Sequence, residues 1–109
     1  MKLLFVCSGN RLRSPTAEAV FSAMDGLEAM SAGTSSDAGN PVSSDLLAWA
    51  DIVFVMENIH RRKLNERFGP MLKKKRLVVL GIPDQYRYMD RELVRVLKVK
   101  VSRYIKPER

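Results

Sequence analysis

The residues best suited to chemistry lie near the N-terminus, in the segment Cys7-Ser8-Gly9-Asn10-Arg11-Leu12-Arg13-Ser14. This segment follows a short apolar run at residues 2–6, which is typical of a buried strand, and it precedes a helical pattern that starts at Pro15. Backbone N–H groups in such a strand-to-helix loop can converge on a phosphoryl group, helped by the positive end of the helix. The segment therefore indicates a loop that binds phosphate.

Several residue types in this loop have a chemical reason to be there. A helix N-terminus and neighbouring arginines favour the thiolate form of a cysteine, so Cys7 is the candidate nucleophile. Arg13 can clamp two phosphoryl oxygens with its planar fork, which lysine could not. Ser14 can donate its hydroxyl to the thiolate or cap the helix, and Asn10 can brace the loop. We expect phosphate to be bound by Ser8, Gly9, Asn10, Arg11, Leu12, Arg13 and Ser14.

The pattern along the chain alternates between strands and helices. Such alternation predicts an α/β fold, a parallel sheet covered by helices on both faces, and the length of 109 residues predicts a single domain spanning 1–109. Ligands of such folds bind at the carboxyl ends of the strands, where both Cys7 and Asp84 should lie. The expected strands are 2–6, 27–31, 51–56 and 77–80; the expected helices are 15–26, 43–49, 57–68 (stopped by Gly69-Pro70) and one capped by Asp90.

Composition excludes several classes of protein. The single cysteine excludes an intramolecular disulfide and an internal dithiol relay, and with one histidine the usual zinc sites have too few soft ligands. No stretch is long enough to span a membrane, and the N-terminal apolar run is too short for an export signal. We therefore expect a cytoplasmic protein without a metal.

The formal net charge is +7, and much of it lies in one stretch. Such a stretch can attract nucleic acid or an acidic protein. No nucleic-acid motif accompanies it, so we interpret it as a solvated helix face and a basic loop, and we expect neither nucleic acid nor a membrane as partner. Attraction of anionic substrates would follow in any case. The stretch comprises Arg61, Arg62, Lys63, Arg67, Lys73, Lys74, Lys75 and Arg76.

The segment from Val6 to Phe21 closely resembles the signature of the low-molecular-weight protein tyrosine phosphatases, and the compact chain is similar to a bacterial subgroup. Ser31-Ala32-Gly33-Thr34 and Ala50-Asp51-Ile52-Val53-Phe54-Val55-Met56 also look like landmarks of that family. The resemblance implies a four-stranded parallel sheet, Cys7 as nucleophile, Arg13 as phosphate clamp, and a mechanism with no metal or cofactor. It implies that the substrate is a phosphorylated protein, foremost on tyrosine, or a small aryl phosphate. The oligomeric state is left open.

The resemblance also implies a general acid. The family uses the aspartate of an Asp-Pro-Tyr motif, and the best match here is Asp84-Gln85-Tyr86. Asp90 is the competing candidate, although it reads as a helix cap, and Asp37 is a more remote one. Tyr86 and Tyr88 are candidates for the wall of the cleft. Arg11 is a candidate for its mouth, where it would favour acidic substrates.

Three other functions fit the same loop. One is an arsenate reductase that uses an external thiol, because the chain has no further cysteine of its own. Another is a phosphocysteine carrier, although Arg13 and the Asp84 loop favour hydrolysis. A third is a binding module for oxyanions without catalysis, which the glutamine at position 85 and the basic stretch would suit. His60 and Trp49 are interpreted as packing or solvated residues.

Overall fold

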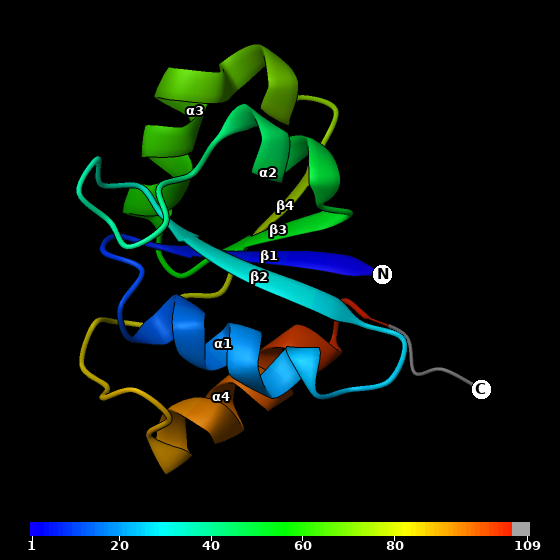
Figure 1. Cartoon of the computed structure of the whole chain (residues 1–109), viewed down its shortest axis with the longest axis vertical. Coiled ribbons are helices and arrows are strands. Elements are labelled where there is room, and N and C mark those ends of the chain that lie inside the picture. Colours follow the sequence, from blue (N-terminus) through cyan, green and yellow to red (C-terminus); the bar gives the residue numbers. More distant parts are fainter. Residues whose placement is uncertain (106–109) are drawn as a thin grey trace.

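A sheet of four parallel strands forms the centre of the molecule, and the computed structural model describes it within residues 1–105 (Figure 1). The strand order is β2-β1-β3-β4, so the first strand lies inside the sheet. The predicted α/β fold with helices on both faces is confirmed. In chain order the elements are β1 (Lys2–Cys7), α1 (Arg13–Ser22), β2 (Glu28–Gly33), α2 (Ser44–Trp49), β3 (Ile52–Val55), α3 (Asn58–Leu72), β4 (Arg76–Val79) and α4 (Arg91–Ser102).

Alternate residues of β1 face two separate apolar clusters, as the period of two in a strand requires. Leu3, Phe5 and Cys7 belong to the cluster shared with α1 and α4, whereas Leu4 and Val6 belong to the cluster shared with α2 and α3. Figure 1 shows the same division, with α1 and α4 on one side of the sheet and α2 and α3 on the other. Because both faces are covered, β1 can be apolar along its whole length.

The carboxyl ends of the strands meet at one edge of the sheet. Cys7 is in register with Gly33 of β2, and Val6 is in register with Val55 of β3. Val55 in turn is in register with Val79 of β4. The loops that follow these strands therefore begin side by side, which brings segments distant in sequence to the end of β1.

Three boundary predictions are corrected. Helix α1 begins at Arg13, so Pro15 is the third helical residue rather than the first, a position where a helix still needs no N–H donor. The same helix ends at Ser22, and Gly26, at a φ of 82°, belongs to the turn beyond it. Helix α3 is not stopped at Gly69-Pro70; a kink with non-helical angles at Phe68 frees the chain for one more turn to Leu72.

Side chains cap the N-termini of two of the helices. Of the two serines at positions 43 and 44, Ser43 caps α2 by accepting the Leu46 N–H. Asp90 caps α4, as predicted, by accepting from the N–H groups of Glu92 and Leu93. Among residues 1–105, no helix is both long enough and apolar enough to cross a membrane.

Candidate active site

The loop between β1 and α1 holds the cysteine sulfur beside a serine hydroxyl. Cys7 Sγ lies 3.0 Å from Ser14 Oγ, and both residues are buried. Asn10, in the left-handed region at a φ of 56°, donates its Nδ2–H to the same Ser14 oxygen at 3.0 Å. The Ser14 hydroxyl also donates to the Ala32 carbonyl at 3.4 Å, so the sulfur and this carbonyl are the two groups within reach of its proton. Ser14 is the second helical residue and not the cap of α1.

The carbonyl groups of this loop are held by the segment that follows β2. The N–H groups of Thr34, Ser35 and Gly39 donate to the carbonyls of residues 7, 8 and 9. This close approach of the two segments requires a glycine at position 33, because a Cβ there would lie 2.5 Å from the Ser8 carbonyl oxygen. Within the described residues, the N–H groups of residues 9–12 donate to no acceptor of the chain, so they remain available to an oxyanion.

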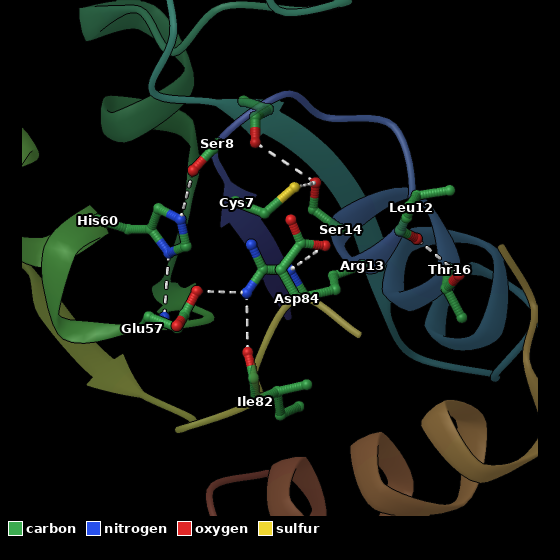
Figure 2. A network of polar contacts seen from close by, with 11 residues as sticks. Cys7, Ser8, Leu12, Arg13, Ser14, Thr16, Glu57, His60, Ile82 and Asp84 are labelled. Carbon is green, nitrogen blue, oxygen red and sulfur yellow. Dashed lines mark hydrogen bonds and ion pairs between the residues drawn. The ribbon is translucent and has the colours of Figure 1, made fainter. Parts of the chain in front are cut away.

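The Arg13 guanidinium is buried and held from behind (Figure 2). Its Nη1 donates to Glu57 Oε1 at 2.7 Å and to the Ile82 carbonyl at 2.8 Å. Its Nε lies 3.8 Å from Asp84 Oδ1. With Nη1 occupied by two acceptors, the Nε and Nη2 edge of the fork is the part that remains for a ligand.

These groups surround one small cavity of about 140 Å³. Cys7, Arg13 and Asp84, the three residues expected to carry catalysis, all contribute to its wall. Asn10 and Ser14 do not line it but support the sulfur from behind. The lining consists of Cys7, Ser8, Gly9, Arg11, Leu12, Arg13 and Asp84.

The three candidate aspartates have different surroundings. Asp84 is 66% exposed at the mouth of the cavity. The Asp90 carboxylate accepts hydrogen bonds from the N–H groups of Glu92 and Leu93, which it caps on α4. The Asp37 carboxylate accepts a hydrogen bond from the Ser35 hydroxyl. Neither Asp37 nor Asp90 lines the cavity. The geometry therefore favours Asp84 as the carboxyl group that can reach a bound phosphate ester.

The two tyrosines expected in the cleft wall lie elsewhere. Tyr86 packs against the apolar cluster of α1 and α4, and Tyr88 is 53% exposed. Neither is among the residues that line the cavity. Trp49 packs against the cluster of α2 and α3, which fits its interpretation as a packing residue.

Sequence reasoning missed the roles of two residues at the start of α3, its N-cap Glu57 and His60 of its first turn. Glu57 holds Arg13, and His60, fully buried, lies with its Nε2 2.9 Å from Ser8 Oγ. His60 Nδ1 accepts the Glu57 N–H at 3.0 Å, and the two residues form a capping box at the start of α3. The spacing Glu57-x-x-His60 directly after a buried strand was the available signal.

The protonation of His60 follows from these bonds. Because Nδ1 accepts a hydrogen bond from the Glu57 N–H, the neutral ring carries its hydrogen on Nε2, which donates to Ser8 Oγ. Burial, aided by the positive charge of Arg13, lowers the pKa of His60 to about 4. The ring is therefore neutral at physiological pH.

The fold and the cavity define a class of protein: a parallel α/β domain whose first strand ends in a cysteine-based oxyanion loop. The family model described as low molecular weight phosphotyrosine protein phosphatase matches residues 2–48, from β1 into α2. This N-terminal part of the chain, with the cysteine loop, is therefore similar to that family. None of the curated proteins matches the sequence.

Solved structures extend the likeness over nearly the whole chain. A low-molecular-weight protein tyrosine phosphatase from Streptococcus pyogenes is 19% identical with a TM-score of 0.78, covering 96% of this chain and 93% of its own. The tyrosine phosphatase Wzb from Escherichia coli K30, in complex with phosphate, is 23% identical with a TM-score of 0.72 and covers 94% of each chain. The YwlE arginine phosphatase from Geobacillus stearothermophilus is 23% identical with a TM-score of 0.68, covering 98% and 99%. At these identities the likeness establishes the fold.

Proposed function

We propose that the chain hydrolyses phosphate monoesters, foremost phosphotyrosine in proteins, through a phosphocysteine intermediate on Cys7. The observation that carries the proposal is the meeting of a sulfur, an arginine fork and an exposed carboxyl group around one cavity of about 140 Å³. These three groups supply a nucleophile, a clamp for the phosphoryl oxygens and a proton donor. The scheme calls for no metal or cofactor.

In the first step the Cys7 thiolate attacks phosphorus in line with the leaving oxygen. An S–P bond forms, the P–O bond to the alcohol breaks, and Asp84 gives its proton to the departing oxygen. Arg13 and the loop N–H groups stabilise charge on the remaining three phosphoryl oxygens. The Ser14 hydroxyl, 3.0 Å from the sulfur, steadies the thiolate before attack.

In the second step a water molecule hydrolyses the intermediate. The Asp84 carboxylate accepts a proton from water while the water oxygen attacks phosphorus, and the P–S bond breaks. The products are inorganic phosphate, the Cys7 thiolate and protonated Asp84, which is the starting state. The Ser14 hydroxyl again supports the sulfur, this time as the leaving group.

Changing Asp84 to asparagine should slow poor leaving groups more than good ones. Phenolate needs a proton as it departs, whereas p-nitrophenolate needs it far less, so we expect a loss of about 10²-fold for p-nitrophenyl phosphate and a larger one for phenyl phosphate. Steady-state kinetics with both esters measures this. The matched control is Asp90→Asn, because asparagine also caps helices well and should preserve α4. Equal losses for both esters, or a larger loss in the Asp90 variant, would assign the proton to another group.

Arg11 supports phosphotyrosine over phosphoarginine as the substrate. Relatives of both types exist, and Arg11 is exposed and lines the cavity. Its cation would repel the guanidinium group of phosphoarginine, and one such contact is worth about 1 kcal/mol in water, or roughly fivefold. We expect a phosphotyrosine peptide to be cleaved faster than a phosphoarginine peptide of the same sequence, with a chelator present.

The variant Arg11→Gln should reduce that preference about fivefold, and 0.5 M salt should reduce it in the wild type as well. Phosphate release from the two peptides at low and high salt is the measurement. If the wild type cleaves phosphoarginine faster, the substrate assignment is wrong. If folded, reduced protein cleaves neither peptide nor p-nitrophenyl phosphate, the phosphatase proposal itself fails.

A further inference from the structure

We propose that His60 is a positioning residue of the phosphate loop, and that it acts by holding the Ser8 hydroxyl so that this hydroxyl donates its own proton to the oxyanion in the cavity. The inference rests on the function proposed above and extends it to α3. Figure 2 shows the chain of contacts, which runs from the Glu57 backbone through the His60 ring to Ser8, beside Cys7.

The placement of His60 follows from the sheet. Strands β1 and β3 are neighbours, and Val6 is in register with Val55, so the residues after Cys7 and the first turn of α3 emerge next to each other. Ser8 lines the cavity, whereas His60 is fully buried and does not. His60 can therefore influence a bound anion only through another residue, and Ser8 is its hydrogen-bond partner on that side.

The direction of the hydrogen bonds decides what Ser8 can do. The His60 Nε2–H donates to the Ser8 oxygen at 2.9 Å, because Nδ1 already accepts a hydrogen bond from the Glu57 N–H. The Ser8 hydroxyl keeps its own hydrogen. The bond from His60 restricts the directions in which this O–H group can point. A donor prepared in this way costs little reorganisation when phosphate enters. Below a pH of about 4, protonation of the ring would place two donors face to face at Nδ1.

The competing explanation is that His60 only caps α3. Two substitutions separate the roles, because each keeps one nitrogen position of the imidazole. In His60→Asn the amide oxygen can take the place of Nδ1 and accept the Glu57 N–H, but nothing reaches Ser8. In His60→Gln the longer amide can take the place of Nε2 and donate to Ser8, but the capping contact is lost.

The first readout is binding of inorganic phosphate, measured by the protection it gives Cys7 against alkylation by iodoacetamide. We expect His60→Asn to weaken phosphate binding about tenfold, the scale of one hydrogen bond, with little change in thermal stability. The conservative His60→Gln variant should recover most of that affinity although it is the less stable of the two. If affinity instead follows stability, so that Gln is affected as much as Asn or more, His60 is a cap and the inference is overturned.

A double-mutant cycle tests whether the effect passes through Ser8. Ser8→Ala should weaken phosphate binding about as much as His60→Asn, and the double variant should be no weaker than Ser8→Ala alone. Losses that simply add would show that the two residues act separately and would contradict the inference. Since the assay needs no turnover, protein that binds phosphate with this pattern yet hydrolyses nothing would leave the positioning role intact while the proposed function fails.

Discussion

Replacing Cys7 by serine is expected to lower kcat for p-nitrophenyl phosphate by roughly 10⁴-fold or more, the scale on which loss of a covalent nucleophile acts. A serine hydroxyl at this position lacks both the ionised sulfur and its polarisability. The neighbouring Ser14, which supports the sulfur at 3.0 Å, supplies no base to activate a hydroxyl. Initial rates with purified, reduced protein measure the loss.

The control for this variant is binding rather than activity. Cys7 is buried, and serine is close to it in size, so the fold and the phosphate cavity should survive. Inorganic phosphate should therefore raise the melting temperature of both proteins. A serine variant that binds phosphate but retains activity within tenfold of the wild type would show that Cys7 is not the nucleophile.

Changing Arg13 to lysine should lower kcat/KM by about 10³-fold or more even though the charge is kept. Arginine uses Nη1 to hold Glu57 and the Ile82 carbonyl. Its Nε and Nη2 edge, with Asp84 Oδ1 3.8 Å from Nε, is the part that can face two phosphoryl oxygens. A lysine ammonium is a single point and cannot make both sets of contacts at once. In the variant, Glu57 would compete with phosphate for the one cation.

Steady-state kinetics on Arg13→Lys and on Arg87→Lys tests this, because Arg87 is an exposed arginine in the Asp84 loop and does not line the cavity. The Arg87 variant should remain near the wild type. An Arg13→Lys variant that keeps more than about a tenth of kcat/KM would mean that charge alone suffices and that the fork has no special role.

Much of the fold could be predicted because its signals are local. Apolar runs such as Ile52-Val53-Phe54-Val55 are buried on both faces, and β3 lies where the run predicts it. Ser43 and Asp90 have the residue types and spacing of helix caps, and both cap helices. The end of α3 was mispredicted because the chain escapes Pro70 by a kink at Phe68, which depends on packing.

In the site, too, the residues that are close in sequence could be predicted, whereas those brought together by the strand order could not. Cys7 ends β1 and Arg13 begins α1, so only a short loop separates them and their meeting in the cavity follows from residues close in sequence. Glu57 and His60 were missed because their partners, Arg13 and Ser8, lie 44 and 52 residues away and are reached only through the order of the strands. Tyr86 was expected in the cleft wall from its place in the motif. Its ring instead packs against the apolar cluster of α1 and α4, a contact that depends on tertiary structure.

The phosphocysteine intermediate on Cys7 is tested most directly by trapping it. Wild type and Asp84→Asn are mixed with excess p-nitrophenyl phosphate, stopped with denaturant at neutral pH within milliseconds, and digested for mass spectrometry. We predict one phosphoryl group on the peptide that carries Cys7, with more of it in the Asp84 variant because that variant lacks the base for the second step. Hydrolysis that proceeds while the Cys7 peptide stays unmodified at every time point would contradict the phosphocysteine mechanism.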